Sequence, residues 1–147
     1  MDSHPCGAWG GACTSDHGAD PFSANIPCAA RQNRNFRTAL WTGCHLQMTL
    51  MCIPPRGETG LEMHPDTEQV IRVESGQAKV CMGSCRDNLD IRCCLCEGDA
   101  VFVPAGTWHN ICNTGPCPLK LSSVYAPPRH PHGTVQCTGE DAATPEC

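Results

Sequence analysis

The chain has 147 residues, a net charge of −5 and 40% hydrophobic residues, which suits a single domain with one modest core. The acidic balance, without any basic run, argues against nucleic acid and anionic membrane surfaces as partners. No apolar stretch approaches the roughly 18 residues of a membrane span. Residues 1–21 lack the basic and apolar regions of a signal peptide, so we expect a cytoplasmic protein.

Fourteen cysteines stand out in the composition. In a short secreted chain this density indicates a disulfide framework. Because no export signal is visible, we expect most of them to be reduced thiols that pack as small hydrophobes. Disulfides, redox sensing and adventitious metal binding stay open for the rest. Cys93 and Cys96 form a C-x-x-C pair, but no second pair follows at zinc-finger spacing, so the signal for structural zinc is weak.

Composition divides the chain into three parts. Residues 1–21 are rich in Gly, Ala, Ser and Asp without periodicity, and we expect a flexible N-terminal tail. Residues 22–137 hold the periodic segments and form the single predicted domain. Residues 138–147 are expected to be a second flexible tail. Within the domain, residues 25–33 favour a short helix of one or two turns, because Pro27 is tolerated at a helix start.

From Phe36 onward the pattern is that of short strands. Apolar or alternating segments predict strands over 36–41, 45–53, 61–64, 69–74, 77–82, 89–96, 100–103, 109–113 and 119–125. Ser75 and Gly76 separate two of these segments and favour a hairpin turn. Paired prolines at 54–55 and 127–128 end strands because proline cannot donate to a ladder. Many short strands without a long helix predict an all-β sandwich or barrel.

Two stretches carry polar residues that such a barrel would bring together. Residues two apart on a strand face the same side, so Glu62 and His64 project together, and Gln69 opens the next strand after a tight turn. His109 begins a later strand. A carboxylate, two imidazoles and an amide oxygen suit a borderline divalent metal. Taken singly, each residue has an ordinary alternative as a hydrogen-bonded structural group or a solvated strand end.

These stretches resemble the two motifs of the cupin family, G-x5-H-x-H-x4-E-x6-G and G-x5-P-x-G-x2-H-x3-N. The second motif is matched at every fixed position, by Gly98, Pro104, Gly106, His109 and Asn113. The first is matched at His64 and Gly76 only. It departs where Arg56 replaces the leading glycine, Glu62 the first histidine and Gln69 the glutamate.

The resemblance covers about residues 36–126 and implies a conical double-stranded β-helix, or jelly-roll barrel, with one divalent metal near its wider mouth. Zinc, iron, manganese and nickel are all compatible. With Glu62 present and Gln69 in place of the glutamate, the ligand set keeps a net charge of −1. The runs FRTALWTG, HPDTEQ, VPAGTWHN and YAPPRHPHGT are similar to small bacterial cupins labelled mannose-6-phosphate isomerase-like. That label is a fold-level analogy. The resemblance also implies a homodimer, paired through residues 46–53 and Trp41.

A proline-stiffened arm follows the last predicted strand. We expect His130 and His132 to line the barrel mouth as catalytic residues that act on a substrate proton. Arg129 is a candidate to bind a substrate carboxylate or phosphate. Tyr125, in step with Leu119 and Leu121, is a second substrate-binding candidate. The alternatives are surface positions for the histidines and core packing for the tyrosine.

Three functions remain open at this level. The first is a metal-dependent isomerase, epimerase or oxygenase that acts on a small polar molecule. The second is a binding module that senses or stores a small ligand or metal without turnover. The third is a structural barrel with a degenerate site, which the three departures in the first motif favour.

Overall fold

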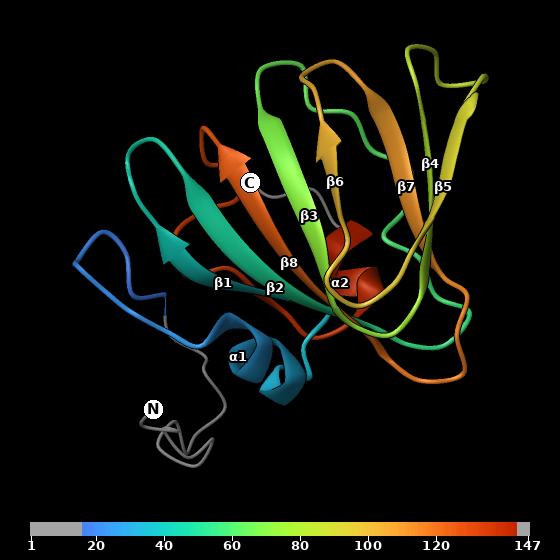
Figure 1. The fold of residues 1–147 in the computed structure, drawn as a ribbon. Coiled ribbons are helices and arrows are strands. Elements are labelled where there is room, and N and C mark those ends of the chain that lie inside the picture. Colours follow the sequence, from blue (N-terminus) through green and yellow to red (C-terminus); the bar gives the residue numbers. More distant parts are fainter. Residues whose placement is uncertain (1–15, 144–147) are drawn as a thin grey trace.

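The structure is a computed structural model that describes residues 16–143 (Figure 1). Two antiparallel sheets enclose one core, in the strand orders β6-β3-β8-β2-β1-β9 and β5-β4-β7. The strands are β1 Arg37–Thr42, β2 Gln47–Ile53, β3 Glu68–Ser75, β4 Ala78–Gly83, β5 Ile91–Leu95, β6 Ala100–Val103, β7 Trp108–Asn113, β8 Leu119–Ala126 and β9 Val135–Gln136. The predicted all-β barrel is confirmed.

The lumen between the sheets has a polar end and an apolar end. Gln47, Tyr125 and Gln69 form one cross-strand row where β2 begins, β8 ends and β3 begins. Four residues along β2 and β8, the row that contains Met51 and Leu121 is apolar and belongs to the main hydrophobic cluster. Because side chains alternate along a strand, these rows all face inward. The buried ionisable residues of the lumen therefore gather at one end of the barrel.

The segment before β3 pairs with the free edge of β7 without forming a regular strand. It makes isolated bridges between Glu58 and Cys112 and between Glu62 and His109. Gly60 lies between these bridges with φ of 90°, which interrupts the extended backbone. The strand predicted over residues 61–64 is therefore wrong in form, although its pairing holds Glu62 in the barrel wall.

The hairpin predicted at Ser75-Gly76 is also wrong, because β3 and β4 belong to different sheets. The chain crosses from one sheet to the other at this point. Gly76 has φ of 102°, and a Cβ atom there would lie 3.3 Å from Leu119 Cα. The turn residues were identified correctly, but strands on either side of a crossover show the same alternation as strands of a hairpin.

The predicted short helix is confirmed as α1, Ile26–Gln32. Asn25 caps it by accepting a hydrogen bond from Cys28 N at 2.9 Å. The helix packs against the outer face of the six-stranded sheet, where Ala30 contacts a cluster with Leu40 and Leu50. A second helix, α2, spans Gly139–Ala143. Neither helix of the described chain is long and apolar enough to cross a membrane.

Segments assigned to the tails make defined contacts where the structure describes them. Asp16 accepts hydrogen bonds from Thr42 N at 2.9 Å and from Gly133 N at 3.0 Å, which ties residues before α1 to β1 and to the C-terminal arm. Strand β9 was not predicted, and α2 lies in the expected C-terminal tail. Residues 1–15 and 144–147 lie outside the described part of the chain.

The described cysteines are mostly free thiols, as expected. Cys28 is disulfide-bonded, and ten others are free. The pair Cys93 and Cys96 belongs to no metal-ligand group within residues 16–143. Six of the ten free thiols are exposed and four are half-buried, so the expectation that they pack as small hydrophobes is wrong for most of them.

Arg56 occupies the position of the first motif's leading glycine and shows why glycine is usual there. Its φ is 67°, and it is the one non-glycine residue with positive φ in the described chain. A left-handed backbone costs a side-chain-bearing residue roughly 1–2 kcal/mol, whereas glycine adopts it freely.

We expect Arg56→Gly to raise the free energy of unfolding by about 0.5–1 kcal/mol, because relief of the strained φ exceeds the entropy cost of glycine. Chemical denaturation would measure the change. Arg92→Gly is the matched control, since Arg92 lies on β5 with ordinary φ, and there glycine should destabilise. Equal losses in both variants would contradict the prediction.

Candidate metal centre

Glu62, His64 and His109 meet at the polar end of the lumen. Their ligand atoms all lie within 4.8 Å of one another, the one such group of three in residues 16–143. The two histidines are 5% and 3% exposed, and their ring centroids are 5.3 Å apart. The structure thus brings together three of the four residues predicted as metal ligands.

Backbone hydrogen bonds fix this arrangement. Glu62 N donates to His109 O at 3.0 Å, and His109 N donates back to Glu62 O at 2.9 Å. Gly106 N donates to His64 O at 2.8 Å from a turn in which its φ is 78°. The glycine of the second motif therefore holds a histidine of the first motif in place.

Gln69, the fourth predicted ligand, lines the same lumen cavity as Glu62 and His109. Its side chain is buried, and its Nε2 donates a long hydrogen bond of 3.4 Å to Ser123 Oγ. The Oε1 atom has no hydrogen-bond partner. An amide oxygen in this position faces the space between the ligand groups and accepts whatever donor or cation enters it.

The electrostatics favour a charged carboxylate beside a neutral imidazole. Burial raises the pKa of Glu62, but the interaction with His64 and the charge of Arg37 outweigh it, so this pKa lies below its ordinary value. Burial lowers the pKa of His109, and the bond to Thr107 offsets this only in part. Because His109 Nδ1 donates to Thr107 O at 2.9 Å, its Nε2 keeps the lone pair that binds metals.

The residues present fit a divalent transition metal. A carboxylate and two imidazoles are ligands for zinc, iron, manganese or nickel. His64 Nε2 and Gln69 Oε1 are both buried without a hydrogen-bond partner, and Glu62 Oε2 lies 3.5 Å from His64 Nε2, too far for a well-formed bond. Unpaired buried groups cost about 1–3 kcal/mol each, and a cation between them would remove that cost.

Arg129 adds a constraint on His64. Its Nε donates to His64 Nδ1 at 3.0 Å, so a neutral His64 carries its own proton on Nε2. A ring that binds metal through Nε2 carries its proton on Nδ1 instead, where it would face the Arg129 donor. Metal binding at His64 therefore requires the exposed Arg129 side chain to move away from Nδ1.

Gln47 anchors the arm that carries Arg129 and His130, and sequence reasoning did not identify it. Its Oε1 accepts from His130 N at 2.9 Å and from Arg129 N at 3.2 Å, and its Nε2 donates to His130 O at 2.9 Å. The side chain is fully buried. In the sequence, Gln47 could have been noticed as an amide residue inside the largely apolar segment HLQMTLMCI, residues 45–53.

His130 and Tyr125 lie together beside the metal ligands, as predicted for the barrel mouth. Their rings meet edge to face with centroids 5.2 Å apart. Burial and the charge of Arg37 lower the pKa of His130 to about 3. Burial raises the pKa of Tyr125, so its phenol stays protonated. At neutral pH the site thus offers an uncharged imidazole and a hydroxyl.

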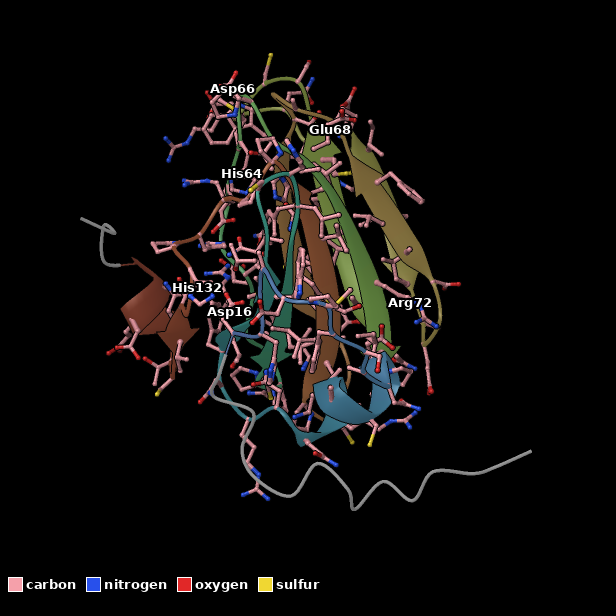
Figure 2. All side chains as sticks on the ribbon, turned by 90° about the vertical axis from the view of Figure 1, so that its left-hand side faces the viewer. Asp16, His64, Asp66, Glu68, Arg72 and His132 are labelled. Carbon is pink, nitrogen blue, oxygen red and sulfur yellow. The ribbon has the colours of Figure 1, made fainter. Side chains whose placement is uncertain are left out.

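His132 lies elsewhere. Its side chain is 56% exposed, with Nε2 2.7 Å from Gly18 O and 3.5 Å from Asp16 Oδ1. Figure 2 shows His132 next to Asp16 and well below His64. His132 thus contacts the segment around Asp16, which also bonds Thr42 and Gly133. Its catalytic role stays a prediction.

Arg37 is the second site residue that sequence reasoning missed. It lines the lumen cavity with Glu62, Gln69 and His109, and it is only 2% exposed. Its Nη1 donates to Gln136 Oε1 at 2.6 Å. In the sequence, Arg37 stands out as a charged residue within the apolar run 36–41. In the structure, β1 pairs with both β2 and β9, and Arg37 lines the lumen cavity.

Comparison with known proteins agrees with this architecture. The cupin domain pattern matches residues 49–125, more than half of the chain. The chain belongs to the cupin family. Its fold is accordingly the double-stranded β-helix that the motif resemblance implied. The departures at residues 56, 62 and 69 are thus variations within a cupin barrel.

Three similar proteins place this cupin among uncharacterized relatives. The uncharacterized protein YrkC of Bacillus subtilis is 50% identical over 131 residues, 89% of this chain and 70% of the relative. The uncharacterized protein L612 of Acanthamoeba polyphaga mimivirus is 36% identical over 115 residues, 78% of this chain and 70% of the relative. The crystal structure of BH2720 from Bacillus halodurans superposes with a TM-score of 0.86 at 52% identity, covering 87% of this chain and 97% of that chain.

The depressed pKa of His130 predicts acid sensitivity. Its pKa is about 3 in the folded state and about 6.5 when unfolded. Between these values the unfolded chain binds the extra proton, so stability falls as the pH falls. We expect the wild type to lose about 2 kcal/mol between pH 7.5 and pH 5 from this group.

Urea denaturation at both pH values would measure this loss, with His130→Gln as the comparison. The variant should lose less stability on acidification than the wild type. His45→Gln is the control, because His45 is exposed on the loop between β1 and β2. An identical pH dependence in the wild type and His130→Gln would refute the assignment.

Proposed function

We propose that this cupin holds one divalent transition metal through Glu62, His64 and His109, and acts there as an enzyme on a small polar molecule. The candidate reactions are isomerisation, epimerisation and oxygenation. The convergence of three ligand groups within 4.8 Å carries the proposal. When bound, such a metal supplies Lewis acidity or, for iron, a site for O₂ chemistry. Gln69 adds an oxygen that faces the same space.

The chain's own polar groups then position the ligand. Tyr125 keeps its proton at neutral pH and is a hydroxyl donor or acceptor at the lumen wall. Neutral His130 is a hydrogen-bonding group held by Gln47. Arg129, exposed on the arm next to His64, is placed to meet an anionic group after it leaves His64 Nδ1. Each of these roles extends the sequence-based predictions.

Binding without turnover is the second candidate, and the pKa of His130 favours it. A general base works best with a pKa near the operating pH, whereas the pKa of His130 is about 3. A structural barrel with a degenerate site fits less well, because a degenerate site has no reason to keep Glu62, His64 and His109 in contact. A metal-loaded barrel that senses or stores a ligand needs no base.

Other sequence-based expectations remain predictions. These are the mannose-6-phosphate isomerase-like reaction, the cytoplasmic location and the homodimer. An apolar groove of about 620 Å³ beside α1 includes Trp41, Leu46 and Met48, and it is the surface that a homodimer formed through the outer face of the large sheet would bury. Light scattering across protein concentrations would test that pairing.

Metal content decides the central proposal. Untagged protein, purified without a metal column, should contain about one transition metal per chain by elemental analysis. The double variant His64→Ala, His109→Ala should retain almost none. His45→Ala is the control and should keep the wild-type content, because His45 is exposed and outside the ligand group. Full metal content in the double variant would assign the metal to the cysteines or to residues outside the barrel.

Removal of the Arg129 side chain should strengthen metal binding. In Arg129→Ala, His64 can carry its proton on Nδ1 without facing a donor, and one positive charge leaves the site. We expect Zn²⁺ affinity to rise about 10-fold, at the low end of effects from groups that contact a ligand.

Competition titrations with a chelator would measure the affinity. Arg34→Ala removes the same charge from an exposed position and should leave the affinity unchanged. Weaker zinc binding in Arg129→Ala would mean that Arg129 supports the metal-bound form of His64.

A further inference from the structure

Arg37 is a buried cation that makes no direct ion pair, although its charge acts on the nearby carboxylate of Glu62. It is 2% exposed, and its hydrogen bonds run to neutral groups, the side chain of Gln136 at 2.6 Å and the hydroxyl of Tyr125. Its Nε atom has no hydrogen-bond partner. Within residues 16–143, no carboxylate lies within ion-pair distance of its guanidinium. Buried arginines are usually paired, because an uncompensated charge in a protein interior is costly.

The surroundings hold the guanidinium in one place. Gln136 on β9 fixes one nitrogen, and the Phe36 ring lies 5.6 Å from the guanidinium carbon. Tyr125, on β8 of the same sheet, also interacts with it. A residue that only linked β1 to β9 would not need a charge, since a neutral amide can bond Gln136 without the several kcal/mol cost of burying an ion. The charge lowers the pKa values of Glu62 and His130, and it is also available to an anionic ligand.

Arg37 faces a small cavity that it shares with the candidate metal ligands. Glu62, Gln69 and His109 line the same space, which measures about 10 Å³. That is room for about one water-sized group. A divalent metal combined with Glu62 and Arg37 would leave this end of the lumen with a net charge of +2. Without a metal the charges of Glu62 and Arg37 balance, and the preference for a small anionic group then rests on the unpartnered Nε–H of Arg37.

A larger cleft adjoins this cavity. It measures about 740 Å³ and runs between residues 58–62 and residues 138–142. Thr59 and Glu62 line both the cleft and the lumen cavity. Phe36, the neighbour of Arg37, and Leu61 and Ala142 give the cleft apolar surface. A ligand of several carbon atoms that lies in the cleft is therefore separated from the lumen cavity only by Thr59 and Glu62.

We propose that this cupin takes a small carboxylic acid, whose carboxylate pairs with Arg37 in the lumen while its carbon chain lies in the cleft. A carboxylate oxygen accepts a strong, charge-assisted hydrogen bond from a guanidinium N–H, and the Nε–H of Arg37 is without a partner. A carboxylate presents one oxygen to a water-sized space, whereas a tetrahedral phosphate is bulkier. The inference deepens the proposed function by naming the class of ligand, and it needs the metal for reaction but not for binding.

Nuclear magnetic resonance of the arginine Nε–H groups tests this on the wild type. Acetate, butanoate, hexanoate, phosphate and chloride would be titrated at constant ionic strength into metal-free protein. We expect the Arg37 Nε–H signal to shift saturably with the carboxylates, most tightly with the longer chains, and not with chloride. A signal that no carboxylate moves would overturn the proposal, and so would phosphate binding tighter than every carboxylate.

Variants give a second measurement by calorimetry. Arg37→Gln keeps a bond to Gln136 but loses the charge, and carboxylate affinity should fall about 10- to 100-fold. Arg92→Gln makes the same change at an exposed position on β5 and should bind like the wild type. Equal affinities in wild type and Arg37→Gln would refute the role of Arg37. Should Arg37→Gln fail to fold, the resonance titration of the wild type decides alone.

The double variant His64→Ala, His109→Ala separates this inference from the metal proposal. Carboxylate binding that persists in it, together with no metal in the wild type, would uphold the role of Arg37 and reject the metal centre. Metal in the wild type without any carboxylate response at Arg37 would reject this inference alone.

Discussion

The site depends on backbone pairing between an irregular segment and the edge of β7. Two reciprocal hydrogen bonds join Glu62 to His109, and Gly106 N holds the carbonyl of His64. These bonds bring together residues that are more than forty positions apart in the chain. Backbone groups at this depth must be paired, so the pairing both closes the barrel wall and positions the carboxylate and the imidazoles. Side-chain chemistry at the mouth follows from it.

The polar groups at this end of the lumen can be buried because they stabilise one another electrostatically. Glu62 stays ionised through His64 and Arg37, and burial favours a neutral His109 whose Nδ1–H donates to Thr107 O. Few of these groups would be stable in the apolar rows around Met51. Unpaired atoms on His64, Gln69 and Arg37 belong to this one end, and Thr49 Oγ1 on β2 is a further one in the described chain. Natural interiors keep such atoms rare, so their gathering here indicates a place built for a ligand.

Alternation and turn residues were enough to predict most of the fold. Strands β2, β3, β7 and β8 fall where apolar periodicity placed them, because each buries one face against the core. The errors have local causes. Ser75-Gly76 marks a turn whether the chain forms a hairpin or crosses between sheets, and Val135–Gln136 is too short for any period to show.

The candidate site was predictable only where the motifs carried it. His64 and His109 were found from spacing, and the structure adds the hydrogen bonds that orient them. Gln47 and Arg37 were missed because their roles arise from partners far along the chain, His130 and Gln136. Each stood out as a polar residue within an apolar strand. Such residues have no local explanation, and tertiary contacts alone reveal what they bind.

The exchange of ligands in the first motif has a consequence for charge. The motif would place a glutamate at residue 69, on β3, whereas this chain has its carboxylate at Glu62, beside β7 and at the wall shared with the cleft. The neutral Gln69 leaves Glu62 as the carboxylate that interacts with Arg37, and Arg37 makes no direct ion pair on its own sheet. Negative charge at the cleft side and positive charge inside give the lumen a polarity. A ligand that enters from the cleft would meet the negative charge of Glu62 before it reached Arg37. A metal bound at Glu62 would neutralise that charge.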